Sequence, residues 1–178
     1  MNMARRLVGA LGVVSPIFAV IVVLVAGFTT PGYHPLARTV SRLVVSPSPN
    51  AVAVDVAIYV LGLTVCAIAV ALGPQAVAGR VYMAVAGIGL VAGAWIRLDP
   101  ASAQVTALHR AITAVSVLAL TAAMLAFAPA FKSRGENGYG RLSFVCGVAA
   151  VGMLLVGLAL ASAAAGAREE PPPPVAAQ

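Results

Sequence analysis

Five long runs of apolar residues constrain this chain more than any other feature. The first run, 7–28, contains one hydroxyl side chain and no charge. As a helix with a rise of 1.5 Å per residue, it would cross a hydrocarbon core of roughly 30 Å. The other runs occupy 52–72, 81–98, 108–131 and 142–165. Because backbone polar groups in lipid must be satisfied within a span, the pattern predicts an all-α integral membrane protein, a bundle of five transmembrane helices.

The composition agrees with this prediction and excludes several classes of protein. Hydrophobic residues make up 61% of the chain and charged residues 9%, whereas soluble domains carry roughly 25% charged residues. The net charge of +6 is spread singly between apolar runs, without the basic patch that a nucleic-acid partner would require. The two histidines and two cysteines show no metal-ligand spacing, so we expect neither a metal nor another cofactor.

The chain is predicted to form one transmembrane domain, 1–166, followed by a proline-rich tail, 167–178. The tail contains two glutamates and four consecutive prolines, a composition that favours an extended and disordered segment. The first apolar run is longer than the core of a signal peptide, which spans about 7 to 15 residues. We therefore expect it to be the first transmembrane helix. Asn50 is placed to cap the second helix and Gly73-Pro74 to end it.

The distribution of basic residues predicts the orientation. With the N-terminus cytoplasmic and the C-terminus outside, the basic residues divide into an inner set, Arg5, Arg6, Arg80, Lys132, Arg134 and Arg141, and an outer set, Arg38, Arg42, Arg97, Arg110 and Arg168. The arginine pair before the first helix and the basic loop between the last two helices favour this choice. Abundant alanine, valine, glycine and arginine with a single lysine are typical of a GC-rich bacterial genome, so we expect a bacterial plasma membrane protein.

In this topology the first and third loops, 29–51 and 97–107, emerge on the same face. Leu36, Val40, Leu43 and Val44 follow helical spacing, which predicts a short amphipathic helix lying in the membrane interface. Its polar face would carry Arg38, Arg42 and Ser41. Pro31-Gly32 before it indicates a turn.

Polar residues on the predicted helices extend this face inward. Asp55 lies near the start of the second helix, where an ionised carboxylate needs a partner such as Arg38, Arg42 or Arg97. A structural Asp55–Arg97 ion pair is favoured over a ligand site. His109, Thr113 and Ser116 share one stripe of the fourth helix and could line a wet crevice, although such hydroxyls usually bond to their own helix.

Short motifs in the outer loops resemble those of a known family. They are Pro31-Gly32-Tyr33-His34-Pro35-Leu36, Val40-Ser41-Arg42-Leu43, Pro49-Asn50, Asp99-Pro100 and Leu108-His109. This set resembles an uncharacterised family of bacterial multi-pass membrane proteins, domain of unknown function 998. The resemblance implies a shared outer motif built on Tyr33, Ser41, Asp99 and His109, and it implies no established activity.

The chain departs from that family at three points. Members usually have an acidic or small residue where His34 stands, Glu where Arg42 stands, and six helices rather than five. The outer face here is therefore more cationic than the resemblance implies. The change favours contact with an anion over catalysis.

We expect a non-enzymatic accessory or structural membrane component that contacts lipid headgroups or a small anion. The predicted binding site is an outer polar cluster of Tyr33, His34, Arg38, Ser41, Arg42, Asp55, Arg97, Asp99 and His109. Anionic lipids are the expected partners, because guanidinium groups suit bidentate phosphate contacts. Partner membrane subunits are also expected, through small residues of the third and fifth helices. Gly89 and Gly93 of the third helix are expected to mark close helix packing rather than a path for a ligand.

Two other functional hypotheses remain open. A membrane-embedded hydrolase or transferase would use Ser41 as nucleophile, His109 as base and Asp99 or Asp55 to orient the base. A small transporter or channel subunit is the second alternative, although five helices without an internal repeat leave little room for alternating access.

Overall fold

The computed structural model describes residues 3–33, 39–45, 48–72 and 76–169 and forms a helical bundle. Its helices are α1 (Met3–Thr29), a short 3-10 helix η1 (Val40–Val44), α2 (Ala51–Ala71), α3 (Val77–Trp95), α4 (Ala103–Lys132) and α5 (Asn137–Glu169). The five α-helices are each long and apolar enough to cross a membrane. The prediction of an all-α membrane protein with five transmembrane helices is confirmed.

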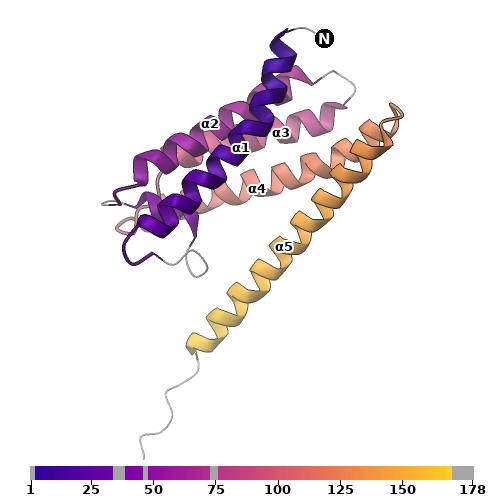
Figure 1. Cartoon of the computed structure of the whole chain (residues 1–178). Coiled ribbons are helices and arrows are strands. Elements are labelled where there is room, and N and C mark those ends of the chain that lie inside the picture. Colours follow the sequence, from indigo (N-terminus) through magenta and orange to yellow (C-terminus); the bar gives the residue numbers. More distant parts are fainter. Residues whose placement is uncertain (1–2, 34–38, 46–47, 73–75, 170–178) are drawn as a thin grey trace, which may run out of the picture.

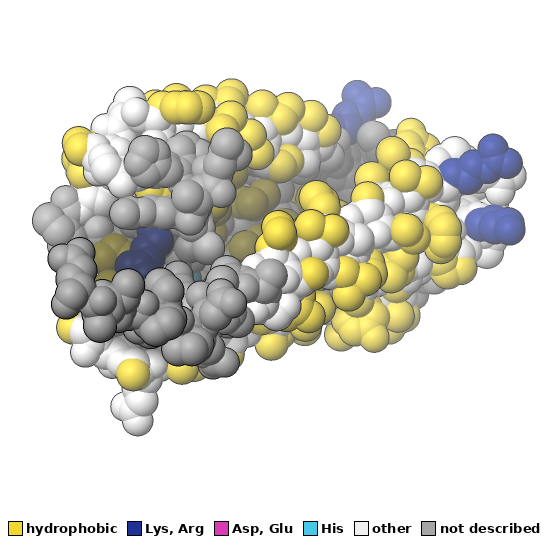
Figure 2. Space-filling view, turned by 90° about the horizontal axis from the view of Figure 1, so that it is seen from below, with side chains coloured by type: hydrophobic (Ala, Val, Ile, Leu, Met, Phe, Trp, Pro, Cys, Tyr) yellow, Lys and Arg dark blue, Asp and Glu magenta, His cyan; other side chains and the backbone are white. Residues whose placement is uncertain are grey.

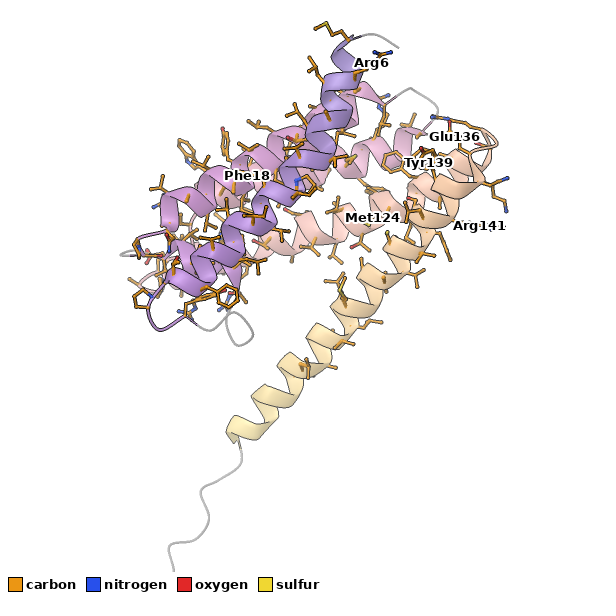
Figure 3. All side chains as sticks on the ribbon, viewed as in Figure 1. Arg6, Phe18, Met124, Glu136, Tyr139 and Arg141 are labelled. Atoms are coloured by element: carbon orange, nitrogen blue, oxygen red, sulfur yellow. The ribbon has the colours of Figure 1, made fainter. Side chains whose placement is uncertain are left out.

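Helices that follow one another in the chain pack side by side (Figure 1). The contacts run from α1 to α2, α2 to α3, α3 to α4 and α4 to α5. Within the described residues, α5 contacts α4 alone and leans away from the other helices. We call the end of the bundle that carries η1 and the α3–α4 connection the η1 end, and the opposite end the turn end. Arg6, Glu136 and Arg141 all lie at the turn end (Figure 3).

All five α-helices begin before the apolar runs that predicted them, α2 by one residue and the others by four or five. The structure starts α3 at Val77, α4 at Ala103 and α5 at Asn137. Their first turns contain polar residues, which a search for apolar runs leaves out. The start of α4 has its own cap, because Ser102 accepts a hydrogen bond from the backbone N–H of Val105 at 3.3 Å.

The ends of the last helices also differ from the predicted bounds. At its far end, α3 stops at Trp95, so Arg97 lies in the connection to α4. Helix α5 continues to Glu169 and includes the first three residues of the predicted tail. The rest of that tail, 170–178, lies outside the described residues, and its disorder stays a prediction.

Glycines let α3 approach both of its neighbours closely. A Cβ atom on Gly87 would lie 2.5 Å from the sulfur of Cys66, and one on Gly62 would lie 2.9 Å from the carbonyl oxygen of Gly87. A Cβ atom on Gly89 would collide with the hydroxyl oxygen of Ser116. Gly89 therefore marks close packing of α3 on α4, as the sequence predicted. These contacts hold α2, α3 and α4 together at short distance.

The first loop is anchored by apolar side chains from η1. Leu43 is 0% exposed and Val44 is 6% exposed, in a cluster with Ala26, Ala51 and Val54. The described part of the predicted amphipathic helix is thus a five-residue 3-10 helix packed on α1 and α2. Leu36 and the predicted stop at Gly73-Pro74 lie outside the described residues.

Asn50 occupies the N-cap position of α2, as expected, but its side chain does not cap the helix. Its amide donates hydrogen bonds to the hydroxyls of Thr29, at 2.9 Å, and Thr30, at 3.0 Å. Because Thr29 ends α1 and Thr30 follows it, these bonds join the two ends of the first loop. These bonds hold the start of α2 next to the end of α1.

Candidate functional site

The imidazole of His109 joins three separate segments at the η1 end. The residue is 5% exposed. Its Nδ1 atom lies 2.6 Å from the carbonyl oxygen of Ile96, at the end of α3. Its Nε2 atom lies 3.0 Å from the hydroxyl oxygen of Ser41 in η1, a residue 68 positions away in the chain. The fold therefore brings together a serine and a histidine that the sequence could not place in contact.

The Ile96 carbonyl fixes the tautomer of the neutral ring. A carbonyl oxygen only accepts, so Nδ1 must carry the hydrogen and donate it. The Nε2 atom of the neutral ring is then an acceptor, and the Ser41 hydroxyl donates to it. A hydroxyl that donates to an imidazole whose other nitrogen is held in place has the geometry of an activated nucleophile.

Asp99 shapes the connection between α3 and α4. Its carboxylate Oδ1 accepts from the backbone N–H of Ala101 at 2.9 Å. Its carbonyl oxygen accepts from the hydroxyl of Thr106 at 2.6 Å. These bonds form the turn that starts α4, on which His109 lies two turns further along. The atom that orients the His109 ring is the Ile96 carbonyl oxygen.

Asp55 and Arg97 form an ion pair between α2 and the residues that follow α3. The guanidinium Nη2 lies 2.5 Å from the carboxylate Oδ2, and the Asp55 side chain is 15% exposed against 46% for Arg97. Arg97 is thus the partner that the sequence required for Asp55. Because a carboxylate neutralises it, this guanidinium is a poorer anion ligand than the other arginines at the η1 end.

An open groove of about 650 Å³ runs between η1, α4 and the inner side of α5. Arg42 and Arg110 line it near the η1 end, together with Ser41 and His109. Its further walls are apolar and include Val117, Leu118, Leu154 and Leu158. Figure 2 shows a hollow between the arm formed by α5 and the rest of the molecule, with hydrophobic side chains on its walls. We call this space the α4–α5 groove.

A second, smaller cavity of about 160 Å³ lies inside the bundle. Its polar lining consists of Ser41, Asp55, His109, Thr113 and Ser116. The hydroxyls of Thr113 and Ser116 donate to carbonyls of their own helix, at 2.9 Å and 2.7 Å, as is usual for such residues. Ser41, His109, Thr113 and Val117 also line the α4–α5 groove, so these four residues lie between the two spaces.

Not every residue of the predicted polar cluster gathers at this site. Tyr33 packs on the apolar cluster that holds η1, and His34 and Arg38 lie outside the described residues. Ser41, Arg42 and His109 meet at the groove, whereas Asp55 and Arg97 pair on the α2–α3 side.

Sequence reasoning missed two parts of the site. The predicted polar cluster did not include Arg110, although this residue was counted among the outer arginines and follows His109 directly. It also missed the wall supplied by α5, because a leucine that lines a groove has the same sequence pattern as one that faces lipid.

Comparison with protein families gives a match over most of the chain. The model of a family described as "Protein of unknown function (DUF998)" matches residues 13–177. No curated protein and no solved structure matches the chain.

Proposed function

The chain belongs to the DUF998 family of proteins of unknown function, and from this premise we propose that it is a membrane component that holds an anionic lipid. The lipid lies in the α4–α5 groove with its headgroup at the η1 end. The observation that carries the proposal is the division of the groove into a cationic mouth, formed by Arg42 and Arg110, and apolar walls further along.

The two parts of the groove match the two parts of a phospholipid. Arg42 and Arg110 are both exposed, and guanidinium groups bind phosphate through paired N–H donors. Val117 and Leu118 follow Arg110 on α4 by about two turns, roughly 10 to 12 Å. An acyl chain along these residues would keep the phosphate within reach of the arginines. A free anion would leave the apolar walls unused.

The arginine of the ion pair is not part of this proposal. Arg97 already has the Asp55 carboxylate at 2.5 Å, and an incoming phosphate would have to compete with it. The lipid contact is therefore assigned to Arg42 and Arg110 rather than to all outer arginines.

The proposed location is a bacterial plasma membrane with the turn end in the cytoplasm. Arg6, Arg80, Lys132, Arg134 and Arg141 belong to the turn end, and each lies within four residues of a helix terminus. The positive-inside rule places such an end in the cytoplasm. The groove mouth then faces the outer leaflet.

The exposed position of α5 supports an accessory role. This helix contacts α4 alone among the described elements, and a Cβ atom on Gly152 or Gly157 would meet nothing within 4 Å. The rest of its surface is available to lipid or to another membrane protein. Affinity purification from native membranes would recover such a partner, and recovery of the chain alone would contradict this part of the proposal.

Native mass spectrometry in lipid discs tests lipid binding directly. In discs of mixed zwitterionic and anionic phospholipid, the wild-type protein should retain anionic lipid after release. Arg42→Ala with Arg110→Ala should abolish this retention. Arg6→Ala with Arg134→Ala removes the same charge at the turn end and should leave it intact.

Two results would contradict the proposal. One is a wild-type protein that retains no anionic lipid. The other is equal loss of lipid in both double variants, which would mean that only net charge matters. Inorganic phosphate distinguishes a lipid site from a free-anion site, because millimolar phosphate should displace a small anion but not a phospholipid whose chain lies in the groove.

A further inference from the structure

We propose that Ser41 and His109 cleave an ester of a lipid held in the α4–α5 groove, with Ser41 as nucleophile and His109 as base. The substrate class is an ester-linked acyl lipid, and this choice of substrate rests on the proposed lipid site. The pair itself rests on different observations, the two hydrogen bonds of the His109 ring.

The geometry of the pair is that of a nucleophile with its base. Ser41 Oγ lies 3.0 Å from His109 Nε2, within the range of about 2.6 to 3.2 Å in which a proton passes between them. His109 Nδ1 lies 2.6 Å from the carbonyl oxygen of Ile96 and donates its hydrogen to it. Nε2 is therefore the unprotonated nitrogen. The His109 ring, which projects from α4, also contacts the C-terminal end of α3. The dipole of α3 there stabilises the positive charge that the ring acquires.

The depth of the pair matches the position of lipid ester groups. Helix α4 has 30 residues and is about 45 Å long, against a hydrocarbon core of roughly 30 Å. If the excess length of the helix is shared equally, about 7 Å of α4 extends beyond the hydrocarbon core at each end. His109 lies about 9 Å from the first residue of α4. The pair therefore stands near the boundary between headgroups and acyl chains, where ester carbonyls lie.

The first half of the reaction forms an acyl-Ser41 ester. Ser41 Oγ attacks the carbonyl carbon of the lipid ester, and its proton passes to His109 Nε2. The guanidinium groups of Arg42 and Arg110, in the same groove, stabilise the negative oxygen of the tetrahedral intermediate. When the ester C–O bond breaks, the leaving alcohol takes the proton from Nε2. The base is then neutral again.

The second half returns the enzyme to its starting state. A hydroxyl compound, water or a second lipid alcohol, gives its proton to His109 Nε2 and attacks the acyl carbon. The bond to Ser41 Oγ breaks, and Oγ recovers the proton. The interior cavity of about 160 Å³ also borders the pair and is lined mainly by apolar side chains, with polar groups at Asp55, Thr113 and Ser116. The α4–α5 groove is open at the η1 end, where the acceptor hydroxyl can enter.

If His109 only joined helices to one another, it would not need its position beside the groove. A histidine that only joins η1 to α3 could lie anywhere in the packed interior, whereas this one lines an open groove together with Ser41. The groove gives a lipid ester and an acceptor hydroxyl access to the pair.

Active-site labelling tests the pair in the full-length protein. In lipid discs, a fluorophosphonate with a long alkyl chain should modify Ser41, with the site identified by peptide mass spectrometry. Ser41→Ala should remove the label, and His109→Gln should slow labelling at least about 100-fold. Ser143→Ala is the matched control, because its hydroxyl is bonded to the Met124 carbonyl at 2.6 Å, and labelling should persist. Melting temperatures of all variants exclude unfolding as the cause.

The products identify the acceptor. With a phospholipid labelled in its acyl chain, free fatty acid indicates water, and an acylated second lipid indicates a lipid alcohol; either supports the proposal. A folded wild-type protein whose Ser41 is not modified above the level of Ser143 would overturn it.

The two proposals fail separately. If Arg42→Ala with Arg110→Ala abolishes lipid retention and slows, without abolishing, the labelling of Ser41 by a short-chain fluorophosphonate, both proposals stand. If the wild-type protein retains no lipid but Ser41 is labelled, the lipid site is wrong and the nucleophile is right. Lipid retention without any labelling of Ser41 would support the lipid site and contradict the proposed reaction.

Discussion

His109 donates through Nδ1 to the carbonyl oxygen of Ile96, at 2.6 Å, where a catalytic triad would place a carboxylate. The acceptor is the carbonyl of the C-cap residue of α3 and would otherwise be one of the unpaired carbonyls of a helix end. The bond therefore serves the fold and the site together. Because the acceptor is backbone, no side-chain substitution at Ile96 removes it.

Asp99 should act on the turn before α4 and not on His109. Asp99→Asn keeps the Oδ1 acceptor for the Ala101 N–H, so fluorophosphonate labelling of Ser41 and the melting temperature should both stay unchanged. Asp99→Ala loses that bond and should cost about 0.5 to 1.5 kcal/mol, measured by scanning fluorimetry in detergent. Loss of labelling in a stable Asn variant would show that the carboxylate itself supports His109.

The side chains of Asp55 and Arg97 should be energetically coupled to each other. Each partner alone would be left near the membrane boundary without its counter-charge, so Asp55→Ala and Arg97→Ala should each destabilise the protein by about 1 to 3 kcal/mol. The double variant should lose less than the sum of the two. Thermal unfolding of all three variants measures the coupling, and Arg134→Ala at the turn end is the control. Additive effects would mean that the pair contributes no interaction energy.

Gly89 should tolerate no side chain. In Gly89→Ala the new Cβ atom would collide with the hydroxyl oxygen of Ser116, and overpacking of this kind typically costs about 1 to 3 kcal/mol. Gly152→Ala on α5 is the matched control, because the added Cβ atom would meet nothing within 4 Å. Ser116→Ala should restore part of the stability lost in Gly89→Ala. Equal melting temperatures for the two glycine variants would contradict the close approach of α3 and α4.

The orientation can be measured with introduced cysteines. In a variant whose own cysteines are replaced by alanine, Ala101→Cys lies at the η1 end and Ser133→Cys at the turn end. A membrane-impermeant maleimide should label position 101 in intact cells and position 133 only after the cells are opened. The reverse pattern would place the groove mouth in the cytoplasm and contradict the proposed location.

The bond network around His109 shows where prediction from sequence stopped. The amino-acid types of Ser41 and His109 marked them as candidates, but the 68 positions between them are bridged by the packing of η1 on α1 and α2. Neither residue carries a local signal of that contact. His34 and Arg38 lie outside the described residues, so their part in the cluster stays a prediction.

The sequence by itself determined the five membrane-spanning helices. A span must satisfy its own backbone hydrogen bonds and present apolar side chains to lipid, and both requirements are local and continuous along the chain. The same local logic correctly indicated the turn at Gly32, which has a φ of 70°, and the close approach at Gly89.

Only the tertiary structure decided which polar groups meet. It paired Asp55 with Arg97, turned Asp99 toward the start of α4, and placed Ser41 against His109. It also supplied α5 as the second wall of the groove. The physical reason is that these contacts depend on how helices are packed and spaced, and a lipid-facing leucine and a groove-facing leucine are the same residue until that packing is fixed.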